Sequence, residues 1–358
     1  MRASPLVTSL AEFTLSSFAD QLAAWGYKPS HAGPILRAFY AGGGRADFSR
    51  LRLPDDLRKC AELLAVPPPV TARQVAGDGT VKLLLGLADG RTVESVLMPD
   101  FHPERAAGCL SSQVGCAMGC DFCATTKTGF ERNLTTAEIV AQFLALRHEA
   151  LSSRRTLRTI VFMGMGEPLL NLDNVLEAVR RIAPNELGGL GWRQITVSTV
   201  GIVPGIRALT EANLNIHLAV SLHAPDDATR CQLLPMGKRF GVWEILEAAD
   251  HYQEATGRPV TIQYCLLEGV NDSVAQARQL AELVATRRMH VNLLRYNPTG
   301  LSLRGVVYRP SGDEAAARFV EELRSRGVVA HLRRPRGRDI DAACGQLRRR
   351  HLAGLGGE

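Results

Sequence analysis

Three cysteines within eight residues, Cys116, Cys120 and Cys123, are the side chains in this sequence with the clearest chemical purpose. Their Cys-x3-Cys-x2-Cys spacing lets one short loop bring three thiolates to a single soft metal centre without ligands from distant sequence. A cluster of four iron atoms needs a ligand on every iron, so three protein thiolates leave one iron open. The spacing therefore predicts a [4Fe-4S] cluster whose open iron binds an outside ligand, as in enzymes that bind a cofactor on the cluster.

A structural zinc site is the alternative for these cysteines. Such a site normally closes four ligands around the metal, commonly from two separated pairs. The sequence contains no second Cys-x2-Cys pair and no His-x3-His pair, which favours the cluster. An aromatic residue, Phe122, directly precedes the last cysteine, and this arrangement resembles the radical S-adenosylmethionine (SAM) superfamily.

The composition is that of a globular protein. With 358 residues, 46% of them hydrophobic, the chain can bury one large core and a small appendage. No apolar run approaches the about 18 to 20 residues that a membrane span needs, and no secretory signal pattern is present, so we expect a cytoplasmic protein without a membrane partner. Eight cysteines in such a chain favour a reducing compartment over a disulfide framework. The formal charge of +6 comes from arginine more than lysine and modestly favours a nucleic-acid partner.

Changes of pattern along the chain predict four parts. Helical spacing of apolar residues covers the N-terminal stretch, and the run from Pro67 to Pro69 ends it because proline cannot continue a helix. Short β runs at 81–87 and 92–98 follow, with Asp-Gly turns that are typical of hairpins. We therefore expect an N-terminal helical accessory domain (1–69), a β-hairpin extension (70–104), an α/β domain (105–335) and a basic C-terminal segment (336–358).

Beyond Cys109 the sequence alternates β-like runs with amphipathic stretches, which predicts a parallel sheet covered by helices. Periodicity alone leaves two architectures open, a doubly wound sheet and an incomplete (β/α) barrel. The helical stretches include 136–150 and 313–326. The expected strands are 159–163, 194–199, 215–222, 260–267, 290–296 and 328–332.

Polar and small residues recur where these expected strands end. Gly164 to Pro168, Ser198, Ser221 to His223 and Asn297 each close or follow one of the runs. Barrel enzymes build their sites from the C-terminal ends of parallel strands, and glycine lets the backbone approach a ligand closely. Each feature alone is compatible with an ordinary turn or strand end, but their recurrence at equivalent positions predicts a shared site.

Several motifs together resemble the RlmN/Cfr-type radical SAM RNA methyltransferases over about residues 90–350. The most specific is Asp-Ala-Ala-Cys-Gly-Gln at 341–346, because the superfamily does not require a cysteine so far from the cluster. The other motifs occupy 109–116, 164–171, 197–199, 221–225 and 269–272.

This resemblance implies a partial (β/α)6 barrel, a [4Fe-4S] cluster on the three clustered cysteines, SAM as cofactor, and methylation of a ring carbon of adenine in RNA. Carbons 2 and 8 of adenine are poor nucleophiles, so direct displacement of the methyl group from SAM would not occur readily. Radical chemistry supplies the missing reactivity. Carried over position by position, the residues that would line the SAM site are Gly166, Glu167, Ser198, Ser221, Leu222, His223 and Asn297.

The resemblance also implies roles for two further cysteines and one acid. In the family scheme one SAM methylates the sulfur of Cys344, and a deoxyadenosyl radical from a second SAM takes hydrogen from that methyl group before the carbon radical adds to adenine. Cys109 would then assist release by forming a disulfide with Cys344. Glu94 would be a candidate proton acceptor, although an acid in a strand is more often on an exposed face. The remaining cysteines, without such motifs, are expected to be small buried apolar residues: Cys60, Cys231 and Cys265.

The motifs point to two branches of this family. The stretch 166–171 resembles the carbon 2 branch, which we favour, whereas 294–299 resembles the carbon 8 branch. We expect large-subunit ribosomal RNA as the first substrate and transfer RNA as a second, a flavodoxin-type electron donor, and a monomeric enzyme. Two alternatives remain: a radical SAM enzyme acting on a peptide or small molecule, and a non-catalytic cluster- or zinc-containing RNA-binding protein. Neither alternative requires Cys344.

Arginines crowd both sides of Cys344. A base in folded RNA must be unstacked to reach a barrel mouth, and basic side chains would hold the backbone meanwhile. The sequence therefore predicts a phosphate track, although basic C-terminal runs are often only solvated. Its members would be Arg333, Arg334, Arg336, Arg338, Arg348, Arg349 and Arg350.

Overall fold

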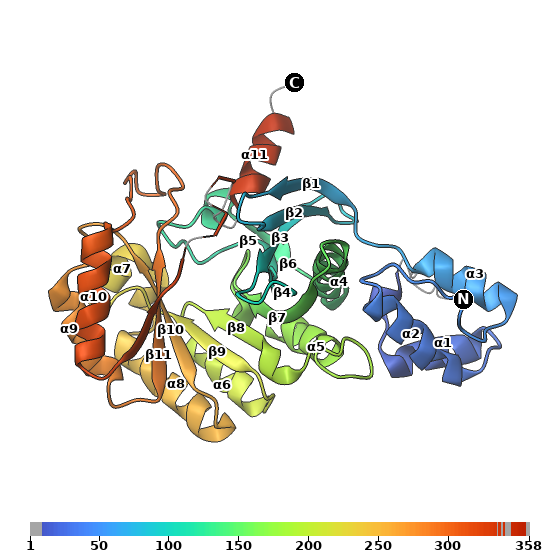
Figure 1. Cartoon of the computed structure of the whole chain (residues 1–358). Helices are drawn as coiled ribbons and strands as arrows, with labels where there is room; N and C mark the ends of the chain where they lie inside the picture. The colour runs from blue at the N-terminus through green and yellow to red at the C-terminus, as the bar shows by residue number, and fades with distance from the viewer. Residues whose placement is uncertain (1–8, 335, 338, 341–344, 356–358) are drawn as a thin grey trace.

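A long curved sheet organises the protein (Figure 1), whose computed structural model describes residues 9–334, 336–337, 339–340 and 345–355. Within these residues ten strands form one sheet in the order β1-β2-β3-β4-β7-β8-β9-β10-β11-β12, and β5 pairs with β6 separately. The strands are β1 (Val70–Val75), β2 (Val81–Gly86), β3 (Thr92–Pro99), β4 (Arg105–Cys109), β5 (Gln113–Gly115), β6 (Phe130–Asn133), β7 (Thr156–Phe162), β8 (Ile195–Thr199), β9 (His217–Ser221), β10 (Val260–Leu266), β11 (Met289–Arg295) and β12 (Val329–Leu332).

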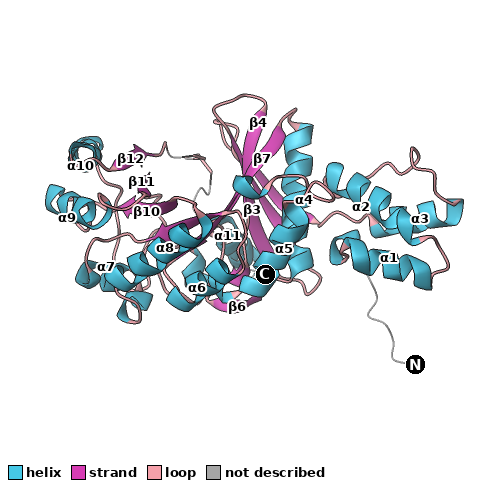
Figure 2. Ribbon diagram, turned by 90° about the horizontal axis from the view of Figure 1, so that it is seen from below, coloured by secondary structure: helices cyan, strands magenta, loops and turns pink. Residues whose placement is uncertain are grey.

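The strands from β4 to β12 in this order are all parallel, with helices along their outer side (Figure 2). This arrangement confirms the α/β class and the incomplete barrel, and the six expected strands match β7 to β12 to within three residues at each end. The helices are α1 (Leu15–Ala24), α2 (Ala32–Ala41), α3 (Asp55–Leu64), α4 (Thr136–Ser152), α5 (Leu172–Ile182), α6 (Val203–Glu211), α7 (Asp227–Leu233), α8 (Val242–Thr256), α9 (Val274–Val284), α10 (Asp313–Ser325) and α11 (Gln346–Leu355).

Local sequence explains where several of these elements begin. Thr135 caps α4, because its hydroxyl accepts the N–H of Glu138 while the Glu138 carboxylate accepts the N–H of Thr135. Ser273 and Gln276 form the same capping box at the start of α9. Strand β10 is buried along nearly its whole length, as expected for a parallel strand covered on both faces.

The predicted β-hairpin extension is three-stranded and belongs to the main sheet. Strand β1 pairs with β2, β2 with β3, and β3 with β4, all antiparallel, so the extension continues the barrel sheet at one edge. The β runs of the sequence identify β2 and β3 but not β1. Both apolar residues at its ends, Val70 and Val75, are about half exposed, so β1 carries no buried apolar stripe.

The N-terminal helices lie at one end of the molecule, beside α4 and α5 (Figure 2). Two arginines from the barrel helices connect the N-terminal part of the chain to the barrel. Arg147 on α4 donates to the carbonyl of Tyr40 at 3.2 Å, and Arg181 on α5 donates to the carbonyl of Ala11 at 3.1 Å. This confirms the helical accessory domain as part of the fold class. Within the described residues, no helix is both long enough and apolar enough to cross a membrane.

Candidate active site

The three clustered cysteines follow β5 in a loop that needs glycine at its start. Gly115 has φ +75°, and a Cβ there would lie 1.8 Å from the carbonyl oxygen of Gly129. A side chain at this position is therefore impossible without moving the paired strand β6. Cys116 and Cys120 are buried, at 8% exposure each, and Cys123 is partly buried.

These cysteines line a cavity of about 360 Å³, within the usual range for small-molecule sites. Its wall comes from the carboxyl ends of β7, β8, β9, β10 and β11, as the sequence predicts for a parallel sheet. Leu222 is fully buried and does not line this cavity, which differs from its expected place. Six of the seven residues expected at the SAM site do line it: Gly166, Glu167, Ser198, Ser221, His223 and Asn297.

The donor set of the cavity fits a cluster better than a zinc ion. Zinc needs its ligands within about 2.3 Å of one point, whereas in a [4Fe-4S] cluster each thiolate binds its own iron. The three thiols of the one loop that line this cavity suit a multi-iron group with an open position.

Glu167 is the acidic residue of the cavity wall. Its carboxylate accepts the backbone N–H of Val200 at 2.8 Å and of Leu169 at 3.1 Å, and these bonds fix its position. Burial raises the pKa of Glu167 to about 7, although both hydrogen bonds favour the charged form. Near neutral pH the group can therefore be charged and can attract a cation in the cavity.

His223 is a neutral side chain held in a strained backbone conformation. Its φ is +59°, and the Asn271 amide donates to its carbonyl at 2.7 Å, which supports that conformation. The N–H of Cys265 donates to Nδ1 of His223 at 2.9 Å, so the proton of the neutral ring is on Nε2. Burial lowers the pKa of His223 to about 3. The residue therefore offers a hydrogen-bond donor to the cavity rather than a charge.

Glu94 on β3 is buried, not on the exposed strand face that its residue type suggests. Its exposure is 2%, and its carboxylate accepts the backbone N–H of Gly345 at 2.8 Å and of Arg348 at 2.7 Å. The Nζ of Lys82 lies 3.0 Å from Oε2 of the same carboxylate. Cys344 lies outside the described residues, but Gly345 directly follows it. Glu94 therefore contacts the segment that carries Cys344.

Cys109 ends β4 on the same face of the sheet as Glu94. Val96 pairs directly with Cys109, and Glu94 is two residues before Val96, so the three side chains share one face. This face adjoins the cavity, because a Cβ on Gly345 would lie 2.7 Å from the hydroxyl of Thr125, which lines the cavity wall. The structure thus places Cys109 and Glu94 on one face of the sheet and packs Gly345, the residue after Cys344, against the cavity wall.

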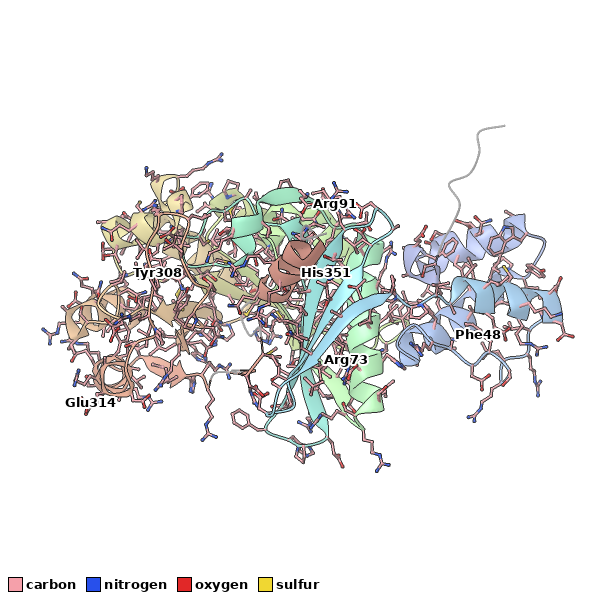
Figure 3. The ribbon with its side chains drawn as sticks, turned by 90° about the horizontal axis from the view of Figure 1, so that it is seen from above. Phe48, Arg73, Arg91, Tyr308, Glu314 and His351 are labelled. Atoms are coloured by element: carbon pink, nitrogen blue, oxygen red, sulfur yellow. The ribbon has the colours of Figure 1, made fainter. Side chains whose placement is uncertain are left out.

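The structure corrects part of the predicted phosphate track. Arg348 is 2% exposed and forms an ion pair with Glu131 on β6, so it is not available to RNA. Arg349 behaves differently: it and Lys127 both donate to the carbonyl of Thr299, at 3.4 Å and 2.7 Å. Seen from above, α11, marked by His351, lies close to the turn that carries Arg91 (Figure 3). Arg333, Arg334 and Arg336 are exposed or partly exposed, and Arg338 lies outside the described residues.

Three residues of this region escape sequence reasoning. The sequence indicates only that Lys82 is a polar residue in a strand, whereas the structure shows that it forms a buried ion pair with Glu94. Asn271 belongs to a family motif without an evident role, and its amide holds the backbone of His223. Cys265, expected to be an ordinary core residue, lines the cavity. Its position near the C-terminal end of an expected strand is the signal that predicts a place in the cavity wall.

Comparisons with known proteins agree with this geometry. A family model described as the Radical SAM superfamily matches residues 110–283. A protein of Opitutus terrae named "Probable dual-specificity RNA methyltransferase RlmN 1" is 68% identical over 95% of this chain and 96% of its own length. A "Probable dual-specificity RNA methyltransferase RlmN" of Thermotoga maritima is 46% identical over 77% of each chain. The crystal structure of a radical SAM methyltransferase from Sphaerobacter thermophilus superposes with a TM-score of 0.86, at 40% identity, over 95% of this chain and 98% of that one.

Proposed function

Because this chain belongs to the RlmN family of radical SAM RNA methyltransferases, we propose that it methylates carbon 2 of an adenine in RNA by way of an S-methylcysteine at Cys344. One observation carries the proposal: Glu94, on the sheet face that also holds Cys109, accepts the N–H of Gly345, which directly follows Cys344 and packs against Thr125 of the cavity wall. The motif at 166–171 favours carbon 2 over carbon 8.

The cluster and SAM would occupy the cavity. Cys116, Cys120 and Cys123 would hold a [4Fe-4S] cluster, and bound SAM would supply both the methyl group and, after reduction, a hydrogen-abstracting radical. Glu167 would pair with the ammonium group of SAM, because it is the acid among the described lining residues. The Nε2–H of His223 would donate a hydrogen bond to the cofactor without adding charge to the cavity.

The residues at the rim would handle the methyl group and the RNA. Cys344 would carry the methyl group, and Cys109 would displace the product by forming a disulfide with Cys344. Glu94 would accept the proton that the methylated ring carbon loses. A peptide or small-molecule substrate does not explain why a strand-end cysteine and a buried acid converge on a second cysteine segment.

We extend the dual specificity in the relatives' names to this chain, with large-subunit ribosomal RNA and transfer RNA as the two substrates. A flavodoxin-type protein would donate the electron, and the enzyme would act as a monomer in the cytoplasm. We also propose the division at 69/70, 104/105 and 335/336 as the boundaries between the accessory, extension, catalytic and basic parts.

Product mapping tests the proposed function most directly. The reconstituted enzyme should methylate carbon 2 of one adenine in large-subunit ribosomal RNA, and nuclease digestion with mass spectrometry of the nucleosides should identify that product. Peptide mass analysis of protein purified from SAM-containing cells should find one added methyl group on Cys344. A carbon 8 product would reassign the branch. Methylated RNA made by a Cys344→Ala variant would refute the mechanism.

SAM affinity should fall as the pH falls through about 7. The pKa of Glu167 is raised to about 7, so the charged carboxylate that attracts the SAM ammonium dominates above this pH and the neutral acid below it. Between about pH 8 and about pH 6 the Kd should rise roughly tenfold. Isothermal titration calorimetry on cluster-loaded protein measures this. Glu167→Gln should bind weakly at both pH values, and the exposed Glu282→Gln variant on α9 should behave as the parent. An unchanged Kd across this range would remove Glu167 from SAM binding.

RNA binding should depend on Lys127 and Arg349 and not on Arg318, a control residue of equal charge. These two cations share the Thr299 carbonyl, which cannot neutralise both, so they are suited to an RNA phosphate. Each alanine substitution should lower the slope of log K against log salt by about 1. Arg318→Ala on α10, 60% exposed, is the matched control and should leave the slope unchanged. Filter binding over a salt series measures this, and an unaltered slope in Lys127→Ala/Arg349→Ala would place the phosphates elsewhere.

A further inference from the structure

Helix α11 begins without a cap of its own. The carbonyl of Gly345 accepts the first intrahelical hydrogen bond, from the N–H of Arg349, so Gly345 is the N-cap residue and Arg348 occupies the third helical position. The N-cap position normally carries a Ser, Thr, Asp or Asn side chain that accepts a backbone N–H. Glycine has no such side chain, and the first turn of α11 therefore needs an acceptor from elsewhere.

Glycine is required at this position for steric reasons. Gly345 has φ +86°, and a Cβ would lie 2.7 Å from the hydroxyl and 2.8 Å from Cα of Thr125. The segment thus packs directly on the loop that follows Cys123. A residue with a capping side chain at position 345 would clash with Thr125. The helix can therefore pack against this loop only if its cap comes from another part of the chain.

Glu94 supplies the missing cap from β3. Its Oε1 accepts the N–H of Arg348 at 2.7 Å, and its Oε2 accepts the N–H of Gly345 at 2.8 Å. In an ordinary capping box two side chains of the helix itself satisfy these two N–H groups. Here one carboxylate, 251 residues away in sequence from Gly345, satisfies both. Its negative charge also suits the positive end of the helix dipole.

Lys82 forms a buried ion pair with this carboxylate. Its ammonium lies 3.0 Å from Oε2 of Glu94, and the two side chains are 1% and 2% exposed. Because a buried charge is costly without a partner, the two side chains stabilise each other. Lys82 on β2 pairs directly with Val96 on β3, and Val96 pairs with Cys109 on β4. Lys82 and Glu94 therefore lie on the sheet face that carries Cys109.

We propose that Lys82 and Glu94 form a dock that holds the Cys344-bearing segment against the cysteine loop, with Glu94 capping α11 and Lys82 acting as a positioning residue through Glu94. The importance of this segment rests on the proposed function, but the dock itself does not. Loss of the Lys82 ammonium leaves the buried Glu94 carboxylate without its ion-pair partner and so weakens the dock.

Hydrogen exchange on the cluster-loaded, RNA-free full chain tests the dock independently of methylation. In Lys82→Met, the amides of Gly345, Arg348 and the rest of α11 should exchange about 5- to 30-fold faster, the range expected for a lost helix cap. Lys82→Arg keeps the positive charge and should restore most of the protection. Leu83→Ala, on the same strand but the opposite face, is the control for general loss of stability.

A double variant separates the loss of the helix cap from a general loss of folding. Lys82→Met/Glu94→Gln removes both members of the buried ion pair, so it should fold, yet Gln offers one acceptor oxygen instead of two and leaves α11 partly uncapped. Its α11 amides should also exchange faster. Parent-like protection of α11 in both variants would overturn the proposal, and so would an acceleration spread evenly over the chain as in Leu83→Ala. If the dock is present but product mapping finds no methylated adenine, the proposed function fails and the dock stands.

Discussion

Replacement of Cys109 with alanine will leave RNA covalently attached to the protein through Cys344. In the proposed mechanism the carbon radical would still form and add to the ring, because neither step uses the Cys109 sulfur. The sulfur-carbon bond that then joins Cys344 to the RNA needs a second thiol to break it. Cys109 ends β4 on the same sheet face as Glu94, whose carboxylate accepts the N–H of Gly345, the residue after Cys344.

A denaturing gel detects the adduct as protein that migrates with RNA and returns to its normal position after nuclease treatment. Mass analysis of the digested peptide should place one modified nucleotide on Cys344. Each enzyme molecule should react at most once, because the covalent adduct blocks further rounds. Cys60→Ala, a matched loss of one thiol on α3, should release methylated RNA normally, and Cys109→Ala/Cys344→Ala should form no adduct. Free methylated RNA at the parent rate from Cys109→Ala would exclude Cys109 as the resolving thiol.

Alanine at any one of Cys116, Cys120 or Cys123 will remove the cluster and all methylation of RNA and of Cys344. In the proposed cluster each thiolate would bind a different iron, so the other two could not substitute for the missing ligand. The thiols lie around one cavity, and burial raises the pKa of Cys116 to about 12, so without a metal to stabilise the thiolate this site favours neutral thiols.

Iron and sulfide analysis after anaerobic reconstitution, together with visible absorption, measures this loss. The parent should hold about four iron atoms per chain and each variant almost none. Cys265→Ala is the control, because Cys265 lines the same cavity but belongs to β10, outside the ligand loop, and that variant should keep its iron. One equivalent of zinc and no iron in the parent would contradict the cluster.

The ligand loop and the strands could be predicted from sequence because they depend on local spacing. Cys116, Cys120 and Cys123 are close in the chain, so their convergence needs only a short loop that begins at Gly115. Parallel strands in a barrel are buried, and their apolar runs identify them without knowledge of their neighbours. Ser198 and Ser221 could be placed at one edge of the sheet for the same reason. The family motifs then predicted the chemistry.

Only the tertiary structure decided which polar residues are buried together. Glu94 and Arg348 look like exposed strand and tail positions, since charged residues are seldom buried without partners and those partners are far away in sequence. Glu94 forms an ion pair with Lys82 on the neighbouring strand and accepts two backbone N–H groups at the start of the last helix. Arg348 forms an ion pair with Glu131. Such pairings depend on how the strands and the C-terminal segment pack against one another. The spacing of residues along the chain does not reveal these long-range contacts.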